Sequence, residues 1–279
     1  MSEARFGMIN YKLVKLVAVL LLSGVTNAWS RQELNRLDNG QTVPAANWPS
    51  LVIVSSPPLA DKCSGALIGP NVILTAAHCV GNKGRVAVNG VSAQCEIPSG
   101  PRRCPKGLDL ALCLSDQPFA GIPRFERPAI NLKWSAMGTE VTLSGFGFPL
   151  VGDLRIGKAR VRTPAASTGC LEVGGIANGC RGDSGGAVFV NDRGRDVLAG
   201  VISIGGVIHG RAPAATRRGA NSRSVALLNA PPSPGCAGGN TGIIDLASPA
   251  ASKFIRDWRR RHATARICGL DPFPRGACF

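Results

Sequence analysis

Several features that mark other classes of protein are scarce or missing from this sequence of 279 residues. The apolar run at residues 16–22 is far shorter than the ~20 residues that a membrane-spanning helix requires. No Cys-x-x-Cys unit is present, which argues against a zinc site, and we expect neither a metal nor another cofactor. Aromatic residues make up only 5% of the chain and form no nucleic-acid-binding motif, so we expect no nucleic-acid partner. Histidine occurs only three times, which leaves few imidazoles for catalysis.

The N-terminal segment has the pattern of a secretory signal peptide. Lys12 and Lys15 precede the apolar run, and small residues follow it up to Ala28. This order predicts a signal peptide over residues 1–28, with a short propeptide over residues 29–36. We therefore expect the mature protein to be secreted or to reside in another extracytoplasmic compartment.

The ten cysteines predict disulfide bonds, because an oxidising compartment preserves them. Two pairs would each close a short loop: Cys95 with Cys104, and Cys268 with Cys278. Loop length alone assigns no partner to Cys113 or Cys170.

The net charge of +15 implies attraction to anionic surfaces such as acidic glycans or lipid head groups. Alternatively, the charge only makes the surface soluble and basic. We expect a monomer.

The most informative motif is Gly-Asp-Ser-Gly-Gly at residues 182–186, just after Cys180. A serine between glycines can occupy a sharp turn with its Oγ exposed. The glycines let backbone N–H groups approach a substrate closely, as an oxyanion hole requires. The alternative is an ordinary glycine-rich turn.

Two further segments supply the partners that a nucleophilic Ser184 would need. His78 follows an apolar run that predicts a strand, and Asp109 lies within the apolar segment 107–112. A buried carboxylate without a partner is costly, so Asp109 requires one, and His78 is the clearest candidate. The chain order His, Asp, Ser is that of the chymotrypsin type of triad, and differs from the order in subtilisin and in esterases of the α/β-hydrolase type.

With these motifs the chain resembles the chymotrypsin-like (trypsin-fold) serine proteases. Residues 63–68 resemble the family's strand before the catalytic histidine, and residues 145–147 resemble its Gly-Trp-Gly, with Phe146 in place of Trp. Residues 198–205 resemble the strand that lines the substrate channel. The likeness extends from about residue 37 to residue 258.

The resemblance implies an all-β fold of two antiparallel Greek-key β-barrels packed side by side with a C-terminal helix. It places the first barrel at residues 37–135 and the second at 136–248. A helix is expected at residues 249–262, because Ser248 can cap it and Pro249 fits its first turn, and a cysteine-containing tail follows at 263–279. The composition agrees, because short β-branched runs alternate with Gly, Pro and Asn turns. Strands are expected at residues 51–54, 72–74, 86–88, 141–143, 187–190 and 197–203. The resemblance also implies two disulfides: Cys63 with Cys79, and Cys180 with Cys236.

The resemblance assigns roles to the motif residues. Ser184 would attack a substrate carbonyl while His78 accepts and returns its proton, and Asp109 would orient the imidazole. The backbone N–H groups of Gly182 and Ser184 would form the oxyanion hole.

The resemblance also predicts the residues of specificity and activation. Asn178 resembles the base of the family's primary pocket, with Gly205 and Gly242 on its walls, and Ser203 lies near the end of the strand that resembles the one lining the substrate channel. Because Asn178 carries no charge, we expect a neutral aromatic or aliphatic side chain at the cleaved bond.

For activation, an activating protease would cleave after Arg36, and the new amino group of Leu37 would pair with Asp183. The alternative is that this segment is a plain linker. The arginine- and proline-rich insertion at residues 206–241 would either restrict access to the cleft, bind an acidic partner or form a surface loop.

The sequence thus predicts a secreted serine endopeptidase acting on polypeptides through an acyl-enzyme. The alternative is a catalytically inactive protease-fold protein that binds anionic glycans or membranes through its basic surface.

Overall fold

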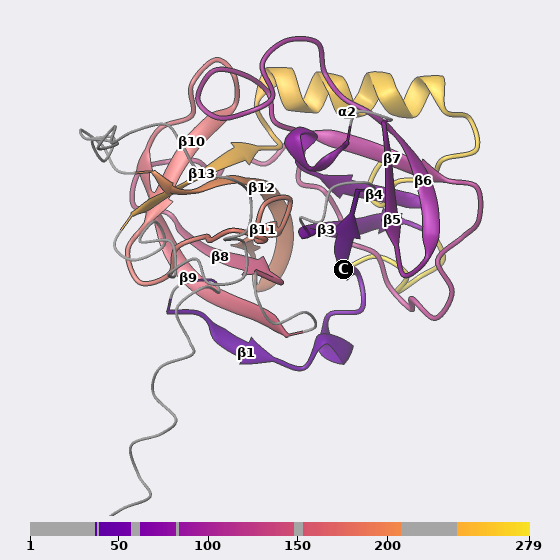
Figure 1. Cartoon of the computed structure of the whole chain (residues 1–279), viewed down its shortest axis with the longest axis horizontal. Helices are drawn as coiled ribbons and strands as arrows, with labels where there is room; N and C mark the ends of the chain where they lie inside the picture. Colours follow the sequence, from indigo (N-terminus) through magenta and orange to yellow (C-terminus); the bar gives the residue numbers. More distant parts are fainter. Residues whose placement is uncertain (1–36, 38, 57–61, 82–83, 148–152, 208–238) are drawn as a thin grey trace, which may run out of the picture. The chain divides into compact units, whose positions relative to one another are not determined.

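The computed structural model (Figure 1) describes residue 37 and residues 39–56, 62–81, 84–147, 153–207 and 239–279. The predicted signal peptide and propeptide, Arg36, Cys236 and most of the 206–241 insertion lie outside the described residues. No helix among the described residues is long and apolar enough to cross a membrane.

The first half of the described chain forms a closed antiparallel barrel with the strand order β2-β3-β4-β7-β6-β5. The strands are β2 (Leu51–Ser55), β3 (Lys62–Gly69), β4 (Val72–Thr75), β5 (Arg85–Val88), β6 (Val91–Glu96) and β7 (Ala111–Ser115). The barrel is filled by aliphatic side chains that alternate along these strands, including Val54, Leu67 and Ile73. Such alternation is what a strand with one buried face requires.

The second half forms another antiparallel barrel, which closes where β9 also pairs with β8. Its strands are β8 (Glu140–Gly145), β9 (Leu154–Thr163), β10 (Cys170–Gly174), β11 (Ala187–Asp192), β12 (Arg195–Val207) and β13 (Asn240–Asp245). A short strand, β1 (Gln41–Val43), is added along β9. All six strands predicted from composition lie within observed strands, and the predicted two-barrel fold is confirmed.

Two 3-10 turns and one helix complete the described elements: η1 (Ala45–Asn47), η2 (Ala77–Cys79) and α2 (Pro249–Arg261). The Ser248 Oγ accepts a hydrogen bond from the Ala251 N–H, as an N-cap should, and Pro249 occupies the first turn. Ile255 and Trp258 are buried in a core cluster that also contains residues of both barrels. Figure 1 shows α2 as the long coil near the C-terminal end of the colour scale.

The C-terminal tail packs along the first barrel. The Cys268 N–H donates to the Ile68 carbonyl, and the Phe125 N–H donates to the Ala277 carbonyl. Gly69 must be glycine here, because a Cβ would lie 1.8 Å from the Arg266 carbonyl oxygen. The tail is therefore a part of the folded domain.

The disulfides confirm two predicted pairs and correct a third. Cys63–Cys79 and Cys268–Cys278 are formed as expected. The predicted Cys95–Cys104 pair is wrong: Cys95 bonds Cys113, and Cys104 bonds Cys170. The reason is strand register, because Cys95 and Cys113 stand directly opposite each other on β6 and β7. Cys180 is disulfide-bonded, and its predicted partner Cys236 lies outside the described residues.

Candidate active site

The imidazole of His78 and the carboxylate of Asp109 are brought together by neighbouring strands of the first barrel. His78 lies on η2 just after β4, and Asp109 lies just before β7, the strand that pairs with β4. The His78 Nδ1 is 2.7 Å from Asp109 Oδ2, and the His78 backbone N–H donates to Oδ1 at 3.0 Å. Since a carboxylate only accepts, Nδ1 is the protonated nitrogen and Nε2 remains the basic one.

Asp109 is completely buried and takes a third hydrogen bond from the second barrel. The Ser203 Oγ on β12 donates to Asp109 Oδ2 at 2.5 Å. Hydrogen bonds from three donors therefore offset the free-energy cost of burying this carboxylate. Ser203 was expected along the substrate channel, and the structure adds a contact with the carboxylate that the sequence did not predict.

Ser184 lies in the turn between β10 and β11 and is held against the first barrel through Ser64. The Ser64 N–H donates to the Ser184 carbonyl at 2.8 Å, and the Ser64 Oγ donates to the Gly182 carbonyl at 2.9 Å. The same Oγ accepts from the Phe146 N–H. Sequence reasoning missed Ser64, because only the fold places β3 beside the Gly-Asp-Ser-Gly-Gly turn.

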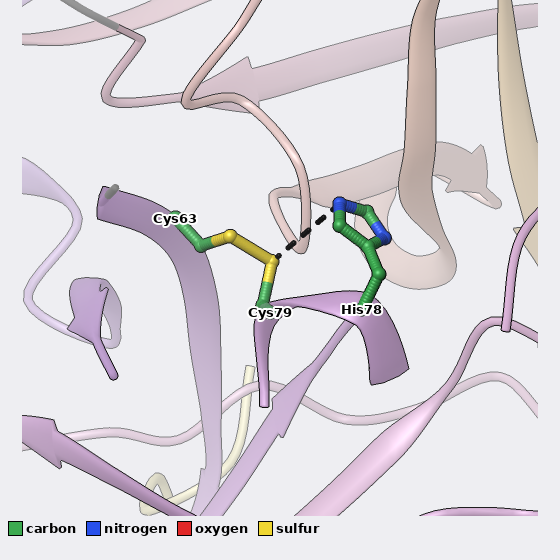
Figure 2. Close-up of side chains that lie close together, drawn as sticks. All are labelled: Cys63, His78 and Cys79. Carbon is green, nitrogen blue, oxygen red and sulfur yellow. Dashed lines mark hydrogen bonds between the residues drawn. A yellow bond between two sulfur atoms is a disulfide. The ribbon is translucent and has the colours of Figure 1, made fainter. Parts of the chain in front are cut away.

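The Cys63–Cys79 disulfide lies beside both His78 and the Ser184 backbone. Figure 2 shows the His78 ring with one nitrogen facing the sulfur of Cys79. This Nε2 is 3.9 Å from Cys79 Sγ, and the Ser184 carbonyl is 3.6 Å from the same sulfur. Within the described part of the chain, no hydrogen bond joins Ser184 Oγ to His78 Nε2. His78 and the backbone of Ser184 thus both lie next to the Cys79 sulfur.

Cys63, His78 and Cys79 also form a compact group of metal-ligand atoms, all within 4.8 Å of one another. Both sulfurs are joined in the disulfide, so neither is a thiolate. Because a thiolate is the form of cysteine that binds zinc, this group does not have the chemistry of a zinc site.

Two backbone N–H groups in the nucleophile turn are available to a ligand. Among the described residues, neither the Gly182 N–H nor the Ser184 N–H donates to a protein acceptor, whereas the Asp183 and Gly185 N–H groups both do. Gly182 has a φ of +93°, and a Cβ on Gly185 would lie 2.2 Å from the Ser64 carbonyl oxygen. The glycines thus permit a turn that leaves two donors unused.

Asp183, the residue before Ser184, is fully buried. Its carboxylate accepts from the Gly147 N–H at 2.9 Å and the Cys180 N–H at 2.8 Å. Burial raises the pKa of Asp183 to about 6, and the two backbone donors and the charge of Arg155 oppose this rise. Gly145 leaves room for the carboxylate, because a Cβ there would lie 2.2 Å from Asp183 Oδ1.

Leu37 is buried in the core cluster of the second barrel. Its carbonyl accepts from the Gly40 N–H at 2.9 Å, and the Gly40 carbonyl in turn accepts from the Arg155 side chain. Arg155 is the cation whose charge acts on Asp183. Among the described residues, Leu37 is thus linked to Asp183 through Gly40 and Arg155.

Asn178 is 2% exposed, and its Oδ1 has no hydrogen-bond partner within the part of the chain that the structure describes. The neighbouring Gly179 N–H donates to Thr241 Oγ1 at 2.7 Å, which ties this segment to β13. Gly205 lies against the same segment, because a Cβ there would be 2.0 Å from the Gly179 carbonyl oxygen. Gly242 lies opposite Ile204 in the pairing of β12 with β13. The structure therefore gathers the predicted pocket residues around the ends of β12 and β13.

Comparison with known proteins identifies the family of this site. The model of the Trypsin family matches residues 37–221. The chain belongs to the trypsin family. It is 28% identical over 239 residues to trypsin eta of Drosophila erecta, a match that covers 70% of this chain and 90% of the relative. The fold of this trypsin-family chain also resembles the scabies mite inactivated protease paralogue S-I1, with a TM-score of 0.57 and 15% identity over 80% of this chain and 99% of that one.

Proposed function

We propose that this protein is a secreted serine endopeptidase in which Ser184, His78 and Asp109 form the catalytic triad. The observation that carries the proposal is the network around Asp109, because it holds the His78 imidazole in the tautomer that leaves Nε2 free to accept a proton. Membership of the trypsin family supports polypeptides as the substrates.

In the proposed reaction Ser184 Oγ attacks the carbonyl carbon of the substrate while His78 Nε2 accepts the hydroxyl proton. The Gly182 and Ser184 N–H groups then stabilise the tetrahedral oxyanion, and removing one such donor in other enzymes costs ~10²-fold to 10³-fold in rate. His78 then passes the proton to the leaving amine, and the acyl group stays on Ser184. Water attacks this acyl group while His78 accepts a proton from it, and His78 returns the proton to Ser184 Oγ as the acid product leaves. The hydrogen bond between Ser184 Oγ and His78 Nε2 would form when substrate binds, because catalytic hydrogen bonds in many enzymes are long or poorly aligned until the complex forms.

The proposed activation is cleavage after Arg36 by another protease. A new α-ammonium group on Leu37 would neutralise the buried Asp183 carboxylate, whose only direct donors among the described residues are two backbone N–H groups. The family match begins at Leu37, which supports this residue as the start of the mature domain. N-terminal sequencing of active material tests this step: a start at Leu37 supports it, and any other start contradicts it.

For specificity we propose a neutral side chain at the cleaved bond. The amide of Asn178 brings no charge to the base of the pocket, so a basic substrate side chain would be buried without a counter-ion. A peptide library cleaved chiefly after Arg or Lys would contradict this assignment.

The disulfides support an extracytoplasmic location, because such bonds persist in oxidising compartments.

A second candidate function is a catalytically inactive binding protein. The observation that favours it is the missing hydrogen bond between Ser184 Oγ and His78 Nε2 among the described residues. A mixed peptide library, incubated with the secreted protein and with its Ser184→Ala variant, separates the two functions. An endopeptidase cleaves the library and the variant does not. Equal, negligible cleavage by both proteins, after processing at Leu37, would favour the binding protein.

A further inference from the structure

A second pocket, of about 450 Å³, lies where the C-terminal tail meets η1, β11 and the start of β12. None of the residues that line it belongs to the proposed catalytic site. Its walls come from segments far apart in the sequence, so the folded domain alone creates it.

Three aromatic rings line this tail pocket. The rings of Trp48 and Phe189 are 5.3 Å apart between centroids, and Phe279 at the end of the tail is 36% exposed. Aromatic faces carry negative electrostatic potential and pack well against alkyl chains. These walls therefore favour an apolar stem that ends in a positive charge.

The carboxyl group of Glu126 is the most deeply buried polar group of the pocket. Glu126 is 2% exposed, and its Oε1 accepts from Ser50 Oγ at 2.5 Å. Among the described residues, no donor reaches Oε2. The backbone of Glu126 is fixed as well, because its N–H donates to the Leu67 carbonyl. One oxygen of a rigidly held carboxyl group is thus left for a ligand.

Besides Glu126, three residues with charged side chains line the pocket: Arg124, Arg195 and Asp196. The Arg124 guanidinium lies over the Phe279 ring, 5.5 Å from its centroid. Burial and, to a smaller extent, the charge of Asp196 raise the pKa of Glu126 to about 7, and the hydrogen bond from Ser50 opposes this rise. Because the Arg124 guanidinium lies over the Phe279 ring, and one oxygen of the buried Glu126 carboxyl group has no donor among the described residues, the buried end of the pocket favours a cationic donor over an anionic ligand.

We propose that the tail pocket binds a primary ammonium group on an apolar stem, with the ammonium donating to Glu126 Oε2 and the stem lying against Trp48 and Phe279. A lysine side chain of a polypeptide and a free alkylamine share this chemistry. The site is independent of the proposed catalytic residues, so its test does not depend on activity.

The test is calorimetric titration of the full chain with four probes: n-pentylamine, Nα-acetyl-lysine-N-methylamide, pentan-1-ol and pentanoate. The two amines should bind saturably at one site, and the alcohol and the acid should not. Binding of the lysine amide shows that a peptide can supply the ammonium group, whereas binding of pentylamine alone identifies a free amine as the ligand. Pentanoate binding in place of the amines would show that the arginines govern the pocket, and would overturn the proposal.

Because the ligand requires ionised Glu126, amine affinity at pH 5 should be about 100-fold weaker than well above pH 7. Binding near pH 7 should also release a proton, which titrations in buffers of different ionisation enthalpy detect. Glu126→Gln keeps the acceptor for Ser50 and should weaken amine binding at least about tenfold, since the charge-assisted bond is lost. Glu140→Gln, on β8 and away from the pocket, is the matched control.

Unchanged amine binding by Glu126→Gln would overturn the proposal. If that variant does not fold, the pH dependence of amine affinity and the proton release on binding, both measured with the unaltered protein, still test the proposal. An affinity that is the same at pH 5 and pH 8, with no proton released, contradicts it.

Discussion

Ser203 and Asp109 are joined by a hydrogen bond of 2.5 Å that crosses from the second barrel to the first. The Asp109 oxygen that accepts it also lies 2.7 Å from Nδ1 of His78. The orientation of the imidazole is therefore coupled to the way the barrels meet. Any change that displaces β12 should therefore alter the orientation of the His78 imidazole.

Replacing Ser203 by alanine tests this coupling. Ser203→Ala leaves Asp109 with one donor fewer, and a hydrogen bond to a charged group contributes about 1.5–3 kcal/mol. We expect kcat to fall about tenfold to a hundredfold with little change in KM, as measured with a peptide substrate. The exposed Ser92→Ala on β6 should leave both constants unchanged. A Ser203→Ala enzyme with unaltered kcat would show that this contact does not position the imidazole.

Ser64 should be needed to hold the nucleophile turn. In Ser64→Ala the Gly182 carbonyl and the Phe146 N–H both lose their side-chain partner in a buried position. We expect a loss of about 1–3 kcal/mol in the free energy of unfolding and a lower kcat, because the oxyanion donors become less ordered. Urea unfolding and steady-state kinetics measure the two effects. Ser55→Ala is the control, because the Ser55 hydroxyl donates to the Ala87 carbonyl where β2 pairs with β5, away from the nucleophile turn. Equal losses in both variants would contradict a special role for Ser64.

Glu126 should make the protein less stable as the pH rises. Burial raises its pKa from 4.5 to about 7, so the folded state binds the proton more tightly than the unfolded state. The contribution of this group to stability is complete below pH 4.5 and is lost as the pH rises to 7, by an amount on the order of 3 kcal/mol.

Glu126→Gln should remove this loss. From pH 4.5 to pH 8 the free energy of unfolding of the variant should therefore rise relative to that of the wild type. Asp183 adds a decline of the same sign between pH 3.8 and about pH 6, which both proteins retain. Parallel pH profiles for the two proteins would show that Glu126 titrates normally.

The Cys104–Cys170 disulfide should matter for activity as well as stability. It joins residues 66 apart, and its loss should cost about 4 kcal/mol by loop entropy. The Cys104 N–H also donates to Ser203 Oγ, so the double variant Cys104→Ser/Cys170→Ser should lower kcat too.

Cys268→Ser/Cys278→Ser removes a bond between residues only 10 apart in the tail, and serves as the comparison. It should cost about 3 kcal/mol and leave kcat unchanged. Thermal unfolding and kinetics on both variants test the difference. A larger loss of kcat in the tail variant would contradict this account of Cys104.

The sequence predicted the features whose signals are local. Chain order and flanking residues identified His78 and Asp109, which the structure brings within 2.7 Å, and a serine before a proline predicted the start of α2. The partner of Cys95 was predicted wrongly because loop length says nothing about which residues a β-sheet places opposite each other. Cys113 is that residue because β6 and β7 pair in one register.

Residues that act through the tertiary structure were beyond sequence reasoning. Ser64 lies in the 63–68 segment, but the resemblance assigned it no role, and it acquires its partners only when β3 meets the Gly-Asp-Ser-Gly-Gly turn. Glu126 is one acid among many in the sequence, and its burial depends on how the tail, η1 and the 124–126 segment converge. Such convergence is a property of packing, which no local pattern encodes.

The most direct test of the central proposal is covalent labelling of the mature protein with a fluorophosphonate, followed by mass spectrometry of the intact chain and its peptides. An enzyme with the proposed triad gains one adduct per chain, located on Ser184, and Ser184→Ala gains none. His78→Ala should react at least ~10³-fold more slowly, because the hydroxyl loses its base. A folded, correctly processed protein that remains unlabelled, or that is labelled equally well without Ser184, would contradict the proposal.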